Sequence, residues 1–324
     1  MKLAVIGAGA IGMKHLEAAA AVEGLEAVAV AELNPSLAQA AAEQFGIRAY
    51  SDYQVMLQQE KPDIAVIALP HFLHKEAAIH CAEHGVHLLL EKPMALNTAE
   101  CDEIIAAADR YGVKLMVGHT QHYFPENREA KRIIESGELG QLVMILDTRH
   151  VHYLREDRPA WFLEKRKSGG GIITNLGSHS IDKIQWMTQS RVTKVRASVS
   201  YLDDRFDVEG SGVIWLETSS GVRATIAQSG YPGVSRNETE IIFTKGMLKL
   251  ETGKGLAISR NGGYVQVPLE PAGQPLAMQL LDLMEAITNN HIPDCSGAYS
   301  KSVISVIESV YASSRTGTEQ VVRV

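Results

Sequence analysis

A glycine pattern near the first residue constrains the fold of this chain more than any other feature. Gly7-Ala-Gly-Ala-Ile-Gly12 follows an apolar segment at residues 3–6 and precedes an alanine-rich stretch at residues 11–22 that is typical of a helix. In a strand–turn–helix unit, such glycines allow a tight turn, a close backbone approach to a pyrophosphate and close packing of helix on strand. The pattern predicts a dinucleotide-binding unit; a glycine turn of structural use only is the alternative.

Short apolar segments alternate with helical patterns through residues 1–120. We expect strands at about residues 3–6, 25–33, 63–69, 86–91 and 114–118, with helices at 11–22, 35–45, 72–84 and 97–112. Such alternation predicts an α/β fold with a doubly wound parallel sheet that is covered on both faces.

After residue 120 the pattern changes. A further helix at 125–137 is followed by short strands joined by glycine, serine and asparagine turns, which predict antiparallel pairing. Two helices follow, at about 276–290 and 298–314. We therefore expect two domains, residues 1–120 and residues 121–324.

The composition excludes several classes of partner and location. With 31 basic and 38 acidic residues the net charge is −7, so no strongly basic surface favours nucleic acid. The three cysteines, Cys81, Cys101 and Cys295, form no CxxC pattern, which favours a reducing compartment. No apolar run is long enough to cross a membrane. We expect a cytoplasmic protein with neither nucleic-acid nor membrane partners.

Glu32 follows the second expected strand, twenty residues after Gly12. An acid at this position accepts hydrogen bonds from the ribose hydroxyls and repels a 2′-phosphate, and no Arg or Lys lies beside it. The sequence therefore predicts NAD as the cofactor, with NADP less favoured. The alternative is a solvated carboxylate at a strand end.

Lys92 follows the fourth expected strand, at the sheet edge where ligands of open α/β sheets bind. Pro93 favours an extended backbone at Lys92, which gives the side chain a defined direction. A lysine there donates to a substrate oxygen or relays a proton. Its position fits equally well a charged residue that ends a strand at the solvent.

A polar stripe follows three glycines at residues 169–171, which we expect to form a loop with an open backbone. Asn175, His179, Asp182 and Trp186 are spaced by four, three and four residues, so they share one face of a helix that begins near Asn175. Polar groups are costly to bury unless they are paired or used, and an imidazole titrates near neutrality. The stripe predicts His179 as a general base; a satisfied core histidine with an N-cap asparagine is the alternative.

Four motifs in this order resemble the Gfo/Idh/MocA family, which includes relatives of glucose–fructose oxidoreductase and inositol dehydrogenase. They are GAGAIG at 7–12, ALPHFLH at 68–74, EKP at 91–93 and GGGxxxNxGxHxxD at 169–182. The resemblance covers nearly the whole chain. It implies an N-terminal Rossmann domain and a C-terminal α/β domain with a large, mostly antiparallel open sheet. It further implies a homodimer or homotetramer through that sheet, and an oxidoreductase that oxidises a secondary alcohol of a sugar or polyol, or reduces the ketone.

The resemblance also implies roles for the polar residues. Lys92 and His179 match the family's catalytic lysine and histidine, so His179 is expected as general base and Lys92 as donor to the same oxygen. Asp182 is expected to orient His179 or a substrate hydroxyl. Asn175 departs from the family, which usually has Asp there. Asn hydrogen-bonds a hydroxyl but accepts no proton.

The remaining candidate residues fall into two sets. The cofactor set includes the glycine turn, the segment that resembles the nicotinamide pocket and the EKP motif: Gly7, Gly9, Ala10, Ile11, Gly12, Glu32, Leu69, Pro70, His71, His74, Glu91 and Lys92. The substrate set is His122, Tyr123, His152, Trp161, Asn175 and His179.

Three further patterns stay open. His80 and His84 have a zinc-compatible spacing on one helix but no evident third ligand, so we predict no metal. His150 and His152 alternate on an expected strand over 142–154, so they face one side, toward a substrate cleft or a subunit interface. Residues 155–167 are either a loop over the substrate or a solvated charged connection, and their charges alone do not indicate an anionic substrate.

Two other functions also remain open. One is an enzyme that retains NAD and cleaves a glycoside or epimerises a sugar. The other is a dinucleotide-dependent sensor without catalysis, against which the presence of Lys92 and His179 argues.

Overall fold

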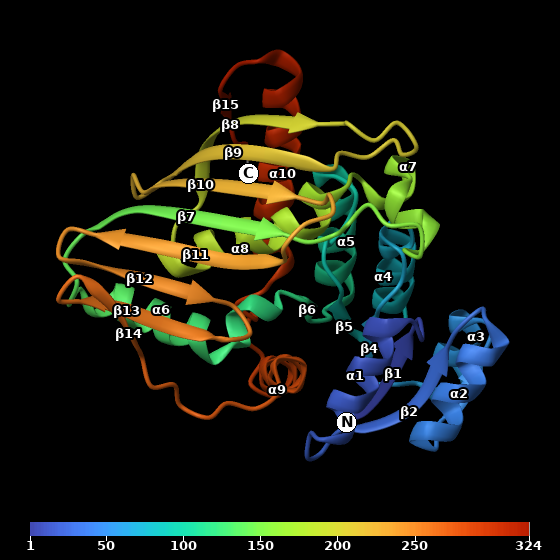
Figure 1. The fold of residues 1–324 in the computed structure, drawn as a ribbon. Helices are drawn as coiled ribbons and strands as arrows, with labels where there is room; N and C mark the ends of the chain where they lie inside the picture. The colour runs from blue at the N-terminus through green and yellow to red at the C-terminus, as the bar shows by residue number, and fades with distance from the viewer. Residues whose placement is uncertain (324) are drawn as a thin grey trace. The chain divides into compact units, whose positions relative to one another are not determined.

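The computed structural model describes residues 1–323 and divides into two compact units (Figure 1). The first comprises Met1–Thr120 and Gly273–Lys301, and the second comprises Gln121–Ala272 and the segment from Ser302 onward. Within residues 1–323, every helix is too short or too polar to cross a membrane.

The first unit contains a six-stranded parallel sheet. Its order is β3-β2-β1-β4-β5-β6, formed by β1 (Lys2–Ile6), β2 (Glu26–Ala31), β3 (Arg48–Tyr50), β4 (Ile64–Ile67), β5 (His87–Leu90) and β6 (Leu115–Val117). Its helices are α1 (Ala10–Ala20), α2 (Pro35–Phe45), α3 (Tyr53–Glu60), α4 (His74–Glu83), α5 (Thr98–Tyr111) and α9 (Pro275–Thr288). This strand order is that of the Rossmann fold, so the predicted doubly wound parallel sheet is confirmed.

Local sequence explains where these elements begin and end. Strands such as β4 are wholly apolar because helices cover both faces of the sheet. The helix α5 begins after Asn97, whose side chain accepts a hydrogen bond from the Glu100 N–H, and it ends at Gly112 in the left-handed conformation.

In the first unit, the structure differs from the expected elements in two places. The strand β3 and helix α3 were not expected. β3 has only three residues, two of them exposed, so it has no apolar run, and α3 is mostly polar with three buried residues. The helix α9 was expected in the second domain but groups with the first unit, where it contacts α1 and β5. Its Leu280 and Leu283 are fully buried. An apolar helix face predicts burial but does not identify the surface that covers it.

The second unit contains a nine-stranded sheet in the order β14-β13-β12-β11-β7-β10-β9-β8-β15. The strands are β7 (Leu142–His150), β8 (Val192–Ser200), β9 (Ser211–Thr218), β10 (Arg223–Ser229), β11 (Arg236–Phe243), β12 (Gly246–Glu251), β13 (Gly255–Arg260), β14 (Gly263–Gln266) and β15 (Gln320–Val321). Only β7 and β10 pair in parallel, so the predicted large, mostly antiparallel sheet is confirmed for the described residues.

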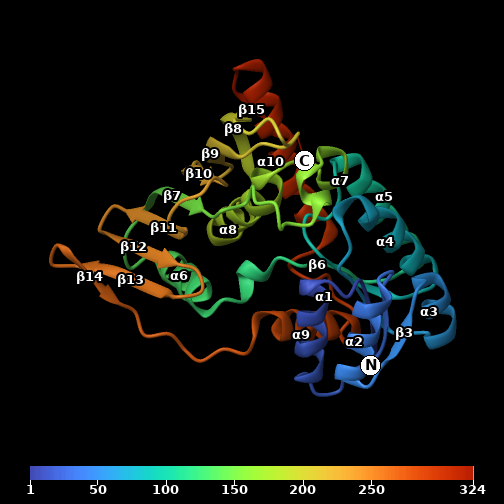
Figure 2. The same ribbon diagram turned by 45° about the vertical axis from the view of Figure 1, so that its right-hand side comes forward.

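Helices cover one face of this sheet. They include α6 (Pro125–Ser136) and α8 (Ser178–Thr188), which lie against it in Figure 2. The remaining helices are the short α7 (Lys165–Ser168) and the long α10 (Gly297–Thr316). The helix α8 thus carries most of the predicted polar stripe along the sheet.

The strand expected over residues 142–154 is shorter in the structure. β7 ends at His150, after which the Val151 N–H donates to the Ser229 carbonyl and the Tyr153 N–H donates to the Gly230 carbonyl. Strand alternation therefore does not extend to His152, which is exposed, and the prediction that His150 and His152 share a strand face is wrong. The sequence has no glycine or proline between His150 and Leu154 that would mark this end of the strand.

Candidate active site

The glycine turn between β1 and α1 forms a cradle whose three glycines have different surroundings. Gly7 has φ 101°, and a Cβ there would lie 2.5 Å from the Ala68 carbonyl oxygen. A Cβ at Gly12 would lie 1.9 Å from the Gly7 carbonyl oxygen, whereas one at Gly9 would meet nothing within 4 Å. Gly9 also precedes α1 without a side-chain cap, so the helix N–H groups there are open to a ligand. These residues fit a dinucleotide pyrophosphate.

Glu32 is held beside this cradle by two backbone groups. Its carboxylate accepts hydrogen bonds from the Ala8 N–H and the Asn34 N–H, each at 2.9 Å. A carboxylate oxygen accepts more than one hydrogen bond, so both oxygens retain capacity for hydroxyl donors. The fixed negative charge suits a ribose diol and disfavours a phosphate.

Lys92 follows Glu91 at the carboxyl end of β5, and its peptide bond to Pro93 is cis. Glu91 is buried, with one carboxylate oxygen 2.7 Å from His15 Nε2 and the other accepting from the Lys92 N–H at 3.2 Å. Burial alone would raise the pKa of Glu91, but the hydrogen bond and charge of His15, with Lys92, lower it. Glu91, expected at the cofactor, is therefore an ionised anchor between α1 and the Lys92 backbone.

His74 connects the turns that follow β4 and β5. Its Nε2 lies 2.8 Å from the Leu69 carbonyl oxygen, and its Nδ1 lies 2.9 Å from the Pro93 carbonyl oxygen. The ring is fully buried, and burial lowers its pKa. Its geometry favours positioning of these two turns over direct contact with a ligand.

The polar stripe begins with a π-helical turn. Residues Ile173–Gly177 form this turn and run directly into α8, so Asn175 lies inside the helical segment and not at an N-cap. Asn175 and Asp182 are buried, whereas His179 is half-buried. Of these three side chains, His179 is therefore the most accessible to a substrate.

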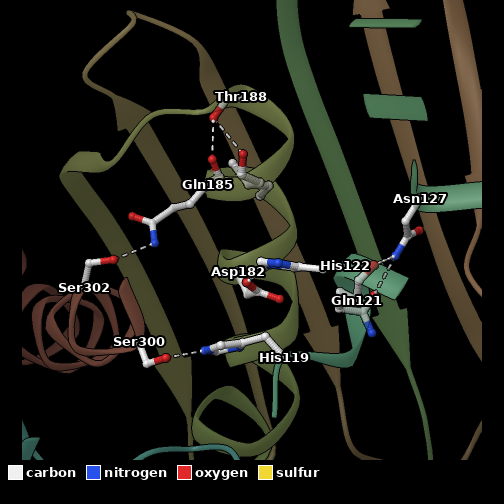
Figure 3. A network of polar contacts seen from close by, with 10 residues as sticks. His119, Gln121, His122, Asn127, Asp182, Gln185, Thr188, Ser300 and Ser302 are labelled. Carbon is white, nitrogen blue, oxygen red and sulfur yellow. Dashed lines mark hydrogen bonds and ion pairs between the residues drawn. The ribbon is translucent and has the colours of Figure 1, made fainter. Parts of the chain in front are cut away.

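Asp182 pairs with His122 in the second unit. Its Oδ1 lies 2.7 Å from His122 Nε2, and Figure 3 shows the two side chains facing each other. The His122 ring also stacks on Trp186 at 4.5 Å between centroids. His122 and Tyr123, both expected to contact substrate, are only 5% and 4% exposed. This packing favours a structural role for these two residues.

Between α8 and the sheet lies a buried polar cluster that the sequence did not reveal. Lys183 Nζ lies 2.7 Å from Asp147 on β7, and the same carboxylate accepts from Ser180 at 2.6 Å and Thr239 at 2.7 Å. Burial would raise the pKa of Asp147, but Lys183 and the two hydroxyls outweigh it and lower the pKa. The cluster fixes α8, and with it His179, on the sheet.

Another buried carboxylate, Glu209, packs against the segment of three glycines at Gly171. Glu209 accepts hydrogen bonds from the Gly171 N–H at 2.8 Å, the Ile173 N–H at 2.9 Å and the Tyr311 hydroxyl at 2.9 Å. A Cβ at Gly170 would lie 2.0 Å from the Tyr311 hydroxyl oxygen. Burial raises the pKa of Glu209, although these donors oppose the shift. The glycines therefore allow close packing, and the expected open loop is instead a buried turn.

Sequence reasoning missed these anchors because each pair is distant along the chain. Glu91 and His15 are 76 residues apart, Asp182 and His122 are 60 apart, and Glu209 and Tyr311 are 102 apart. The one local signal was Lys183, a charged residue next to the buried Ile184.

The second unit also contains a cavity of about 310 Å³. It is lined by Arg149, His150, Val151, Arg158, Asn175, Leu176, Ser235, Arg236, Asn237 and Lys254. A larger hollow of about 580 Å³ in the first unit lies at Lys2, Glu26 and Asp63, at the amino ends of the parallel strands. Ligands of such sheets bind at the carboxyl ends, so we assign no role to the larger hollow.

The other expected residues are not gathered into these clusters. Trp161 stacks on Phe162 at 3.7 Å between centroids, within the short helix Ala160–Leu163. The rings of His80 and His84 lie 4.4 Å apart. Within residues 1–323, no group of three or more His, Cys, Asp and Glu side chains is arranged to hold a metal ion.

Known proteins resemble both units. The family model "Oxidoreductase family, NAD-binding Rossmann fold" matches residues 1–119, and "GFO/IDH/MocA C-terminal domain" matches residues 127–249. The structure of aldose-aldose oxidoreductase from Caulobacter crescentus has a TM-score of 0.91 at 25% identity, covering 99% of each chain.

Two curated relatives match part of their own length. The 2,7-anhydro-N-acetylneuraminate hydratase of Mediterraneibacter gnavus is 30% identical over 64% of this chain and 55% of that protein. A 1-carboxy-3-chloro-3,4-dihydroxycyclohexa-1,5-diene dehydrogenase of Comamonas testosteroni is 29% identical over 74% of this chain and 60% of that protein. The match therefore spans less than two thirds of either relative.

Proposed function

Because the chain belongs to the GFO/IDH/MocA family of NAD-binding oxidoreductases, we propose that it is an NAD-dependent dehydrogenase of a sugar or polyol. The observation that carries the proposal is the glycine cradle, with open space at Gly9 and the fixed Glu32 carboxylate beside it. The cradle holds the pyrophosphate and Glu32 holds the ribose. Bound NAD supplies the hydride acceptor.

His179 and Lys92 handle the substrate proton in this proposal. His179 is half-buried and accepts the proton of the reacting hydroxyl. Lys92 donates a hydrogen bond to the same oxygen, which stabilises its developing negative charge. Asn175 orients a neighbouring hydroxyl, and Asp182 stabilises the helix through His122.

The substrate class rests on what the relatives are named for. A hydratase of an anhydro sugar acid, a carboxylated cyclic diol dehydrogenase and an aldose-aldose oxidoreductase all act on polyhydroxylated compounds. We propose the same class here, with the second unit forming the substrate side. We also propose that copies associate through the outer sheet face, where Val213 is 61% exposed, and light scattering would then report a dimer or tetramer.

The test is an NAD-reduction screen of sugars, inositols, sugar acids and glycosides, repeated with NADP. We expect turnover with NAD and much weaker turnover with NADP; equal efficiency would contradict the role of Glu32. Lys92→Ala and His179→Ala should each lower kcat by about 10²- to 10⁴-fold. Lys75→Ala and His84→Ala, at partly exposed or exposed positions on or just after α4, are the matched controls and should keep full activity. Near wild-type turnover in both active-site variants would refute the assignment.

A second candidate is an enzyme that retains NAD and returns it to its starting state in each cycle. The hydratase relative favours it, since hydration has no net redox change. Protein that keeps NAD through dialysis and converts an anhydro sugar or glycoside without net NADH would select this candidate over a dehydrogenase.

A further inference from the structure

The cavity in the second unit is cationic. Of the ten described residues that line it, four are Arg149, Arg158, Arg236 and Lys254, and none of the ten is Asp or Glu. It also contains Asn175, a buried polar residue of the π-helical turn. The cavity therefore joins the polar stripe to a concentration of positive charge.

Two of these cations are compensated by neighbouring acids. Arg236 Nε lies 3.2 Å from Glu238, and Lys254 Nζ lies 3.3 Å from Glu251. Their side chains are largely exposed, so they contribute mainly to the rim of the cavity.

Arg149 and Arg158 differ from these two cations in having no acidic partner in direct contact among the described residues. Among residues 1–323, neither guanidinium has a carboxylate within 4.0 Å. Arg158 donates from Nε to the Tyr153 carbonyl oxygen at 2.9 Å, and its guanidinium lies 4.0 Å from the Tyr153 ring centroid. Burial lowers the pKa of both arginines, because each positive charge has lost water. Asp147 near Arg149 and Asp157 near Arg158 oppose this shift but do not reverse it. A partly desolvated cation without a carboxylate in direct contact favours an anionic ligand.

We propose that this cavity binds an anionic group of the substrate, a carboxylate or a phosphate ester, through Arg149 and Arg158, beside Asn175. The inference rests on the proposed function, whose substrate it narrows to an acidic sugar or polyol. A guanidinium presents a planar set of donors that matches the two oxygens of a carboxylate or phosphate. Asn175 then contacts a hydroxyl of the same molecule, which sets the orientation of the substrate relative to its charged group.

The experiment compares acids with their neutral counterparts on the full-length protein. Glucuronate, galacturonate and quinate are each paired with the methyl ester, and glucose 6-phosphate is paired with glucose. We expect the best acid to exceed its neutral partner at least tenfold in kcat/KM. Arg149→Gln and Arg158→Gln should lower kcat/KM for that acid about 10- to 100-fold, and change the neutral compound less than threefold.

Two further variants act as controls. Arg132→Gln removes the same charge from α6, where Arg132 pairs with Glu129 at 2.7 Å outside the cavity, and should have no effect. Arg149→Lys keeps the charge and loses the planar donors, so it should recover part of the activity on the acid. Thermal unfolding of each variant shows whether the chain is folded.

Binding is measured separately from turnover, by saturation-transfer NMR with the same acid–ester pairs. An acid signal that exceeds the ester signal and disappears in Arg149→Gln supports the inference, even if no compound reduces NAD and the proposed function fails. Equal signals for acid and ester would overturn it. The inference would also be overturned if kcat/KM were higher for the neutral compounds. It would likewise be overturned if the arginine variants lowered kcat/KM equally for the acid and its neutral counterpart. Either result would leave the dehydrogenase proposal intact.

Discussion

Absent side chains do two different things in the glycine turn. At Gly12 the missing Cβ allows α1 to pack against the turn, since a Cβ there would lie 1.9 Å from the Gly7 carbonyl oxygen. At Gly9 the missing Cβ leaves open space, and the backbone angles there suit any residue, with φ −67° and ψ −177°. We therefore propose that Gly12 serves the fold and that Gly9 serves the ligand.

This contrast predicts opposite phenotypes for two alanine substitutions. Gly12→Ala should lower the free energy of unfolding by about 3 kcal/mol or more, because the backbone has to shift. Gly9→Ala should leave stability within about 0.5 kcal/mol and weaken dinucleotide binding at least tenfold. Urea unfolding and NADH fluorescence titration measure the two effects. Equal loss of stability in both variants would contradict this division of roles.

In the helix α8, buried polar side chains fix the position of a candidate functional residue. The helix presents His179, and Lys183, one turn further along, fixes the helix to the sheet through its ion pair with Asp147, together with Ser180 and Thr239. A buried pair of this kind adds little net stability against an apolar replacement, but removing one partner leaves an uncompensated charge.

Asp147→Asn should therefore lower the free energy of unfolding by roughly 3–5 kcal/mol at neutral pH. Glu217→Gln, which breaks the partly exposed Lys194–Glu217 pair of the same sheet, is the control and should leave the urea midpoint nearly unchanged. Because folding lowers the pKa of Asp147, its stabilisation is complete above the ordinary value of 3.8 and is lost as the pH falls through the lower folded value. An effect of Asp147→Asn that grew below pH 3.8 would refute this account.

At the scale of the whole molecule, the two units do not follow the order of the chain. The segment Gly273–Lys301 belongs to the first unit, although it follows β14 of the second unit's sheet and precedes β15 of the same sheet. The buried face of α9 covers α1, the helix that begins at the glycine cradle. The helix that begins at the glycine cradle therefore packs against residues that lie far along the sequence.

Leu283→Ala in α9 should destabilise the first unit by about 2–5 kcal/mol, because Leu283 is fully buried. Hydrogen exchange should then show lost protection in α1 and β5. Leu281→Ala, two residues earlier and 48% exposed, is the matched control and should keep wild-type protection. Loss of protection confined to residues 121–272 would contradict the assignment of α9 to the first unit.

The sequence by itself determined the features that depend on local spacing. The period of apolar residues identified the parallel and antiparallel parts, and the glycine spacing identified the cradle at Gly7, Gly9 and Gly12. These follow from short-range geometry, since a side-chain period or a turn needs only neighbouring residues.

Only the tertiary structure decided which charges meet. The pairing of Glu91 with His15 and of Asp182 with His122 depends on contacts between elements that are 76 and 60 residues apart. The cationic cavity likewise draws Arg149, Arg158 and Asn175 from separate segments. Sheet order brings such residues together, and no local pattern encodes that order. The sequence does not show whether the partner of a carboxylate or a guanidinium is solvent, a buried histidine or a substrate.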